Sequence, residues 1–316
     1  MLALKIALTG SLVWYIVHTV PLSKVVPALR QAHLPDVFAA FAALLVARGL
    51  MGLRMKRVTD QQGMSLKVSQ LIGISLASTF YGTFLPGSLS GGLIRWYRIS
   101  RKDGKPTEAL AAIGFDRLMD TMTAAIFGLG CWLLSAQARP RFVIGLGLLG
   151  ATLGCLFLYF LAFHAQGSRL TSNSVGRLLK PRIPSWLREK LKIIFDASKQ
   201  YHGLPAAELA SIFSLSLLIH WISTAAFVFL GWSLGIHLTL IDFGWIRSAW
   251  LLLAMLPITI AGLGLREGSF LIFLKPYGVA GPQVIALSCL RLATSLAIAA
   301  LGGLLELRYL RRQHKA

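Results

Sequence analysis

Long apolar runs are the feature that most restricts the fold of this chain. About six of them are long enough to cross roughly 30 Å of hydrocarbon as helices, near residues 3–20, 37–53, 108–136, 142–164, 205–235 and 283–307. With 55% hydrophobic and only 14% charged residues, the composition excludes an ordinary soluble domain. We therefore predict an all-α polytopic membrane protein that forms one transmembrane domain over residues 1–316.

Two further apolar segments, near 68–98 and 245–275, are interrupted by proline and glycine. In each, an arginine follows the proline by nine positions, and the residues concerned are Pro86, Gly91, Gly92 and Arg95, then Pro257, Gly262, Gly264 and Arg266. Proline removes a backbone donor and glycine permits positive φ and close approach. Backbone groups freed at bilayer depth must be buried in protein or face water. We predict two re-entrant hairpins beside a polar cavity, an arrangement typical of transporters.

The basic residues give the orientation of the spans. Of the 32 Lys and Arg residues, 22 fall at Lys5, in the connections 54–67, 95–107 and 165–204, and after Glu306. The connections near 21–36, 137–141, 236–247 and 275–282 carry six. The positive-inside rule places the richer set, and hence both termini, in the cytoplasm.

With that topology the two broken segments start on opposite sides of the bilayer. Gly128 follows Arg117 by eleven positions, and Gly302 follows Arg291 by eleven positions. We predict an inverted repeat with halves at about 68–136 and 245–307, although chance similarity competes in a chain so rich in Leu, Gly and Ala.

Asp116 and Asp120 are an acidic pair inside an apolar run. Being four residues apart, they share one helix face, where two carboxylates need a cation or proton. Arg95 or Arg117 can supply it if the fold brings either near. The alternative is a position at a cytoplasmic helix N-terminus, where acidic groups are favourable without a partner.

Other residues of the apolar runs have simpler interpretations. Arg291 lies deep in the last run and needs a partner, for which Glu267 is the acidic candidate. Arg266 and Glu267 are adjacent and would point in different directions on a helix. We interpret Arg48 as an interface residue whose side chain reaches toward water, and His220 as a hydrogen-bonded packing residue. The three cysteines have no metal-ligand spacing and are expected to pack.

The net charge of +20 points to membrane lipids as partners. The basic residues are spread over short loops without a recognition module, which argues against nucleic acid. Anionic head groups attract such loops. The longest basic loop, about 165–204, contains an amphipathic stretch at 183–195 that is typical of a helix lying in the interface.

The chain resembles a known family at these positions. Leu85-Pro86-Gly87, the Gly-Leu-Gly-Leu-Arg-Glu-Gly stretch at 262–268 and Arg291 are similar to the lysylphosphatidylglycerol-synthase transmembrane region family, also called flippase-like domain proteins. The resemblance implies a lipid-handling domain of the bacterial plasma (inner) membrane, and some stand-alone relatives are associated with polyprenyl-lipid pathways. Leu93 stands where the family motif often has an acidic residue. The soluble acyltransferase domain of the larger members is absent, so we do not expect aminoacyl transfer.

Three functions stay open. The first is a lipid flippase or lipid-binding transporter, with a head-group cavity formed by charged residues of both broken segments and the helices after them: Arg95, Asp116, Arg117, Asp120, Arg266, Glu267 and Arg291. The second is a scaffold that recruits a lipid-modifying enzyme. The third is a membrane-embedded head-group transferase, which the sequence disfavours because it has no nucleotide loop, metal motif or nucleophile-base pair. We expect no cofactor and no metal.

Overall fold

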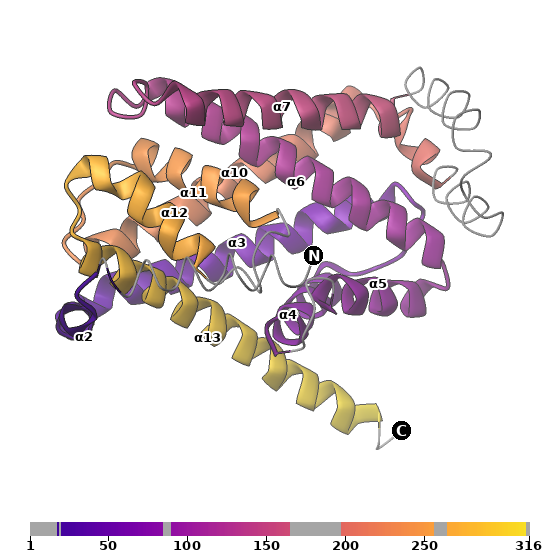
Figure 1. Ribbon diagram of the computed structural model, residues 1–316. Helices are drawn as coiled ribbons and strands as arrows, with labels where there is room; N and C mark the ends of the chain where they lie inside the picture. The colour runs from indigo at the N-terminus through magenta and orange to yellow at the C-terminus, as the bar shows by residue number, and fades with distance from the viewer. Residues whose placement is uncertain (1–17, 19, 85–89, 165–196, 256–263, 314–316) are drawn as a thin grey trace. The chain divides into compact units, whose positions relative to one another are not determined.

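The computed structural model describes residues 18, 20–84, 90–164, 197–255 and 264–313 (Figure 1). The predicted first span, the amphipathic stretch 183–195 and the residues Pro86, Pro257 and Gly262 lie outside this part, except for His18 and Val20 at the end of the first span.

All regular structure in the described residues is helical (Figure 1). The long helices are α3 (Leu34–Asp60), α6 (Pro106–Leu134), α7 (Phe142–Phe163), α10 (Ala206–Trp232) and α13 (Gly281–Gln313). The shorter elements are η1 (Leu22–Lys24), α2 (Val25–Arg30), α4 (Val68–Phe84), α5 (Ser90–Asp103), η2 (Lys199–Tyr201), α11 (Leu240–Met255), α12 (Leu265–Leu274) and η3 (Lys275–Tyr277). The prediction of an all-α membrane protein is confirmed.

Among the described residues, four helices are long and apolar enough to cross a membrane: α3, α7, α10 and the Gly281–Leu307 part of α13. On α7, large apolar side chains such as Phe142, Leu146 and Phe157 are at least 60% exposed. A continuous exposed apolar face of this kind is stable against lipid rather than water.

Local sequence explains where several helices begin. Pro106 is the first residue of α6, where a proline costs no hydrogen bond, and Gly104 before it has a φ of 68°. The Thr239 hydroxyl accepts from the Asp242 amide at 3.1 Å at the start of α11. The two Pro/Gly segments each contain a helix pair, α4 with α5 and α11 with α12, whose members contact one another.

The described chain divides into two compact units. Unit 1 comprises Met1–Ala47, Ala124–Leu149 and Ile219–Ala300, and unit 2 comprises Arg48–Thr123, Gly150–Leu218 and Leu301–Ala316. Each unit therefore contains one of the two helix pairs.

In unit 2, small residues allow close helix contacts. A Cβ on Gly91 of α5 would lie 2.8 Å from the Ser78 carbonyl oxygen of α4, and one on Gly302 of α13 would lie 2.6 Å from the Leu76 carbonyl carbon. A second contact region is aromatic, where Phe115 stacks on Tyr201 with ring centroids 4.2 Å apart. Close helix approach at small residues is how membrane helices gain packing energy without a hydrophobic driving force.

Unit 1 packs around the α11–α12 pair. Trp245 of α11 is fully buried and meets Phe273 of α12 with ring centroids 5.4 Å apart. A Cβ on Gly244 would lie 2.6 Å from Cys131 Sγ, so α11 approaches the end of α6 closely. The pair is thereby held against its neighbours by aromatic and small-residue contacts.

Candidate functional site

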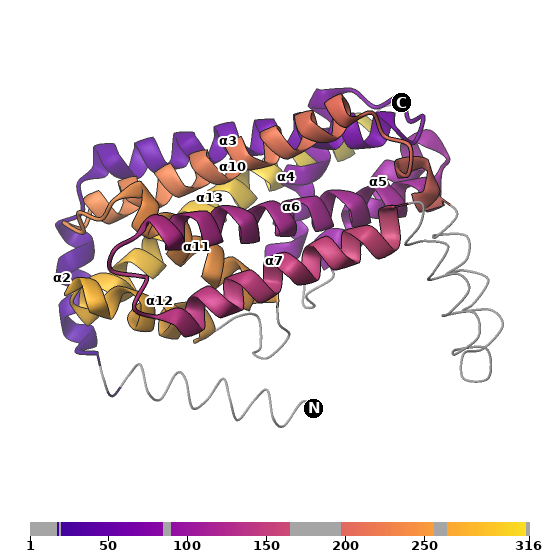
Figure 2. The same ribbon diagram turned by 90° about the horizontal axis from the view of Figure 1, so that it is seen from above.

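Arg54 of α3 is the centre of a buried group of charges in unit 2. Its Nε donates to Asp116 Oδ1 at 2.9 Å, and its Nη1 donates to Asp120 Oδ1 at 2.7 Å and to Ser216 Oγ at 3.0 Å. The side chains of Arg54 and Asp116 are only 3% and 5% exposed. One planar guanidinium reaches both carboxylates because they are one turn apart on α6. Ser216 comes from α10, which runs beside α3 in this unit (Figure 2).

Arg95 of α5 approaches the second oxygen of Asp116. Its Nη1 lies 3.6 Å from Asp116 Oδ2. The arginine that follows the first Pro/Gly segment, one of the two candidate partners, therefore lies near the acidic pair. Arg117, the other predicted partner, is exposed, and its side chain makes no hydrogen bond or ion pair with the described residues.

Arg48 belongs to the same group. It is partly buried near the middle of α3, and the charged groups that act on it are Arg95 and Asp120. No hydrogen bond or ion pair joins its side chain to any described residue. Continuous helix through Asp60 places it about 13 Å along the axis from Arg57, and its interpretation as an interface residue stays a prediction.

These five residues, Arg48, Arg54, Arg95, Asp116 and Asp120, are called the charge cluster below. Three arginines against two aspartates leave one positive charge in excess. Arg54 already satisfies one oxygen of each carboxylate, so the excess lies at Arg48 and Arg95. Uncompensated charge away from water is costly, and guanidinium groups bind phosphate and carboxylate through paired hydrogen bonds. The arrangement can therefore hold an anion.

Sequence reasoning recognised that the acidic pair needs a cation but missed its main partner. Arg54 was counted only among the basic residues of a cytoplasmic connection, and Ser216 carried no signal. The sequence did contain one indication: Arg54 directly follows the apolar run predicted at 37–53, so a helix that continues through it places its side chain next to the membrane-spanning segment. Glu306, missed as well, is buried on α13 and accepts from the Tyr81 hydroxyl at 3.3 Å and from Arg98.

In unit 1 a second polar group lies where α12 begins. Gly264 has a φ of 76°, which glycine adopts without strain, and its amide donates to Glu267 Oε2 at 3.1 Å. Glu267 Oε1 accepts from Arg266 Nη2 at 2.6 Å and from the Ser288 hydroxyl of α13 at 2.7 Å. Glu267 therefore caps α12 and links it to α13.

Two expectations about this group are wrong. Arg266 and Glu267 do not point apart, because the long arginine side chain folds back over the first turn to meet its neighbour. Arg291 does not pair with Glu267. Its guanidinium lies 5.6 Å from the centroid of the Phe227 ring and donates to the Ser295 hydroxyl. A cation over an aromatic face is a known alternative to an ion pair.

His220 of α10 is 1% exposed, and its Nδ1 accepts from Arg247 Nη1 at 3.1 Å. The prediction of a hydrogen-bonded packing residue is confirmed. Arg247, counted with a connection, is instead buried in α11. Among the described residues, no group of three or more His, Cys, Asp and Glu side chains is placed to hold a metal ion.

Apolar spanning helices with buried charges on them define an integral membrane protein of the polytopic helical class. The chain belongs to the family described as lysylphosphatidylglycerol synthase TM region, whose model matches residues 2–303. No curated protein and no solved structure matches the chain. The family and the helical membrane fold together make this a membrane protein related to lipids.

Proposed function

We propose that this protein moves a lipid between the leaflets of a membrane and binds the anionic head group of that lipid at the charge cluster. The observation that carries the proposal is the excess positive charge at Arg48 and Arg95. Membership of a family named for a lipid synthase supports a lipid as the ligand.

The argument for an anion is electrostatic. Arg48 and Arg95 repel one another, and Asp116 and Asp120 are held mainly by Arg54. An anionic group between Arg48 and Arg95 offsets this repulsion and accepts hydrogen bonds that Arg48 otherwise does not make within the described chain. Charge-assisted hydrogen bonds of this kind are about twice as strong as neutral ones.

The wider proposal keeps the predicted topology. The α4–α5 and α11–α12 pairs are re-entrant hairpins related by an inverted repeat, and both termini face the cytoplasm of a bacterial cell. In each pair the second helix begins close to an arginine, Arg95 in α5 and Arg266 in α12. Arg266, Glu267 and Arg291 are proposed as head-group contacts of unit 1. The exposed Arg117 is the weakest member of the predicted set.

Leaflet transfer tests the proposal directly. The purified chain is reconstituted in liposomes that contain phosphatidylglycerol labelled with a fluorophore on one acyl chain, and transfer is followed by chemical quenching of the outer leaflet. We expect Arg48→Gln and Arg95→Gln each to slow transfer about tenfold or more, because a charge-assisted hydrogen bond contributes about 1.5–3 kcal/mol. Arg117→Gln is the matched control and should transfer at the original rate.

The contrary result is equally clear. If Arg48→Gln and Arg95→Gln remain folded and transfer as fast as Arg117→Gln, the charge cluster does not bind the head group. Native mass spectrometry of lipid retained by each variant separates loss of binding from loss of movement. A wild-type chain that retains phosphatidylglycerol without transferring it would contradict transport and leave only lipid binding.

A further inference from the structure

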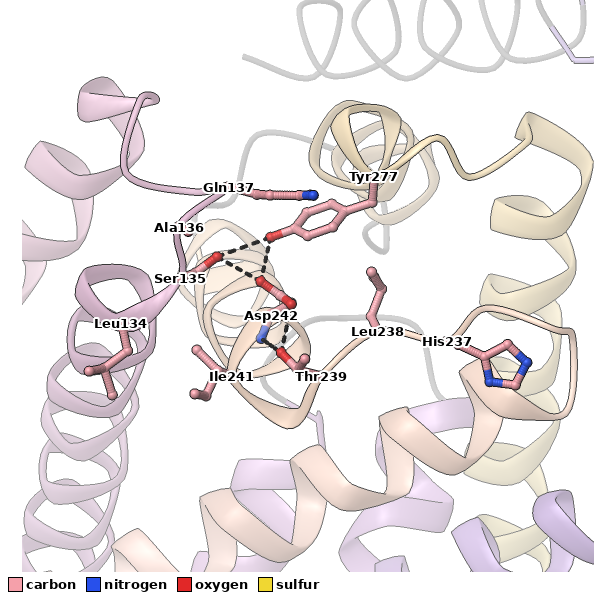
Figure 3. A pocket seen from close by; sticks show the side chains of 10 residues that line it. All are labelled: Leu134, Ser135, Ala136, Gln137, His237, Leu238, Thr239, Ile241, Asp242 and Tyr277. Atoms are coloured by element: carbon pink, nitrogen blue, oxygen red, sulfur yellow. Dashed lines mark hydrogen bonds between the residues drawn. The ribbon is translucent and has the colours of Figure 1, made fainter.

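A hollow of about 370 Å³ opens in unit 1, and none of the charged groups described above lines it. Its wall is formed by three connections (Figure 3): the end of α6 with Gln137, the segment from His237 to Asp242, and Tyr277 of η3. These connections were predicted to lie on the side of the membrane opposite the basic loops. Its volume is in the range of small-molecule sites.

A carboxylate lies at the base of the hollow. Asp242 Oδ1 accepts from the Ser135 hydroxyl at 2.6 Å and from the Tyr277 hydroxyl at 2.8 Å, and Oδ2 accepts from the Thr239 hydroxyl at 2.6 Å. A carboxylate has about four acceptor positions, so one on Oδ2 remains for a further donor. All three bonded donors are neutral, and no ion pair joins Asp242 to the described residues.

The donors are held in place from behind. Trp245 Nε1 donates to the Tyr277 hydroxyl at 3.0 Å, which fixes the direction in which that hydroxyl donates to Asp242. Partial burial disfavours the phenolate and raises the pKa of Tyr277 to about 12, so it remains a donor at neutral pH. The base of the hollow is thus organised before a ligand arrives.

The rim carries polar groups that are not used in the fold. The side chains of Gln137 and His237 are exposed and make no hydrogen bond with the described residues. The Gln137 amide extends toward Tyr277 (Figure 3). Arg141 bonds to the backbone of this segment, where its Nη1 donates to the Gln137 carbonyl oxygen at 2.9 Å.

We infer that this hollow binds a neutral polyhydroxylated group, such as a glycosyl group. A hydroxyl on the ligand can donate to Asp242 Oδ2, and another hydroxyl of the same group can accept from, or donate to, the Gln137 amide. The carboxylate at the base repels a phosphate. The positive charge of Arg141, whose guanidinium is bonded to the carbonyl oxygen of the lining residue Gln137, disfavours an ammonium group. The hollow belongs to unit 1 and binds its ligand whether or not the charge cluster transfers a lipid.

The experiment uses the full chain in lipid nanodiscs, free of glycerol and of glycoside detergents, which would compete. The first measurement is saturation-transfer NMR with methyl β-D-glucopyranoside as the soluble probe. The second is native mass spectrometry of retained monoglucosyl diacylglycerol against plain diacylglycerol. Both are repeated with Gln137→Ala, which removes an exposed side chain without a structural bond. Gln31→Ala, an exposed glutamine of unit 1 outside the hollow, is the matched control.

We expect wild type and Gln31→Ala to bind the sugar, and Gln137→Ala to bind it about fivefold more weakly, the factor expected for one lost hydrogen bond. Asp242→Asn should weaken it further. If Gln137→Ala weakens retention of the glycolipid but not binding of the soluble glucoside, the ligand is the sugar head group of a lipid. If it weakens both, the hollow also binds free glycosides. Binding that is absent, or equal in Gln137→Ala and wild type in both measurements, overturns the inference. Equal displacement of the glucoside by choline also overturns it.

Discussion

Replacing Arg54 by methionine tests whether the charge cluster holds unit 2 together. Methionine keeps an unbranched apolar side chain but removes the donor that bonds Asp116, Asp120 and Ser216. Two carboxylates one turn apart on α6 then lose their bonded guanidinium, and Arg95 Nη1 remains 3.6 Å from Asp116 Oδ2. Removing one partner of a buried ion pair destabilises by about 3–5 kcal/mol, since the remaining charge stays buried.

Arg57, on the same helix, provides the control. Its Nη1 lies 3.4 Å from Glu208 Oε2, and the two side chains are 41% and 36% exposed. Exposed pairs of this type contribute about 0–1 kcal/mol. Arg57→Met should therefore cost little, and the two substitutions should differ by roughly 2–5 kcal/mol.

Thermal unfolding in nanodiscs of one lipid composition measures this difference. At about 2–4 °C per kcal/mol, Arg54→Met should unfold roughly 4–20 °C below Arg57→Met. Adding Asp116→Asn to Arg54→Met should recover part of the loss, because it removes one of the stranded carboxylates. Equal midpoints for Arg54→Met and Arg57→Met would refute the claim that a buried charge network stabilises this unit.

Two further predictions concern packing and pH. Gly302→Ala should lower the unfolding midpoint, because the added methyl group would lie 2.6 Å from the Leu76 carbonyl carbon. Such overpacking costs about 1–3 kcal/mol, which exceeds the at most about 1 kcal/mol that alanine gains over glycine in helix propensity. Gly73→Ala, with nothing within 4 Å, should be neutral or slightly stabilising, and a midpoint for Gly302→Ala at or above that of Gly73→Ala would contradict the close contact. Tyr277 has a pKa of about 12 in the folded protein against about 10 ordinarily, so the stability it contributes is present below pH 10 and is lost as pH rises toward 12. The midpoint of wild type should fall more steeply than that of Tyr277→Phe over this pH range, and parallel curves would disprove the coupling.

Much of the fold follows from local sequence. The runs predicted at 108–136, 142–164 and 205–235 are the helices α6, α7 and α10 within a few residues at each end. The two interrupted segments each contain two described helices, α4 and α5 in the first and α11 and α12 in the second. Gly264 adopts the positive φ that its residue type permits.

The candidate site was predicted less completely. The acidic pair Asp116 and Asp120 was recognised, and Arg95, one of its two candidate partners, lies near Asp116. The dominant partner, Arg54, is separated from Asp116 by more than sixty residues and was missed. The pairing expected for Arg291 was wrong because the ring of Phe227, on another helix, supplies a contact that spacing does not reveal.

The sequence alone therefore determined that this protein lies in a lipid bilayer and that its secondary structure is helical. It also determined which two apolar segments are interrupted and that two carboxylates in an apolar run need a cation nearby. These depend on hydrophobicity, backbone chemistry and charge, which each segment carries by itself. Only the tertiary structure decided that Arg54 meets that need, that Arg48 joins it without a bond in the described chain, and that three connections enclose the hollow around Asp242. Which distant side chains meet depends on helix packing, and a helix rotated by one residue presents a different set of partners.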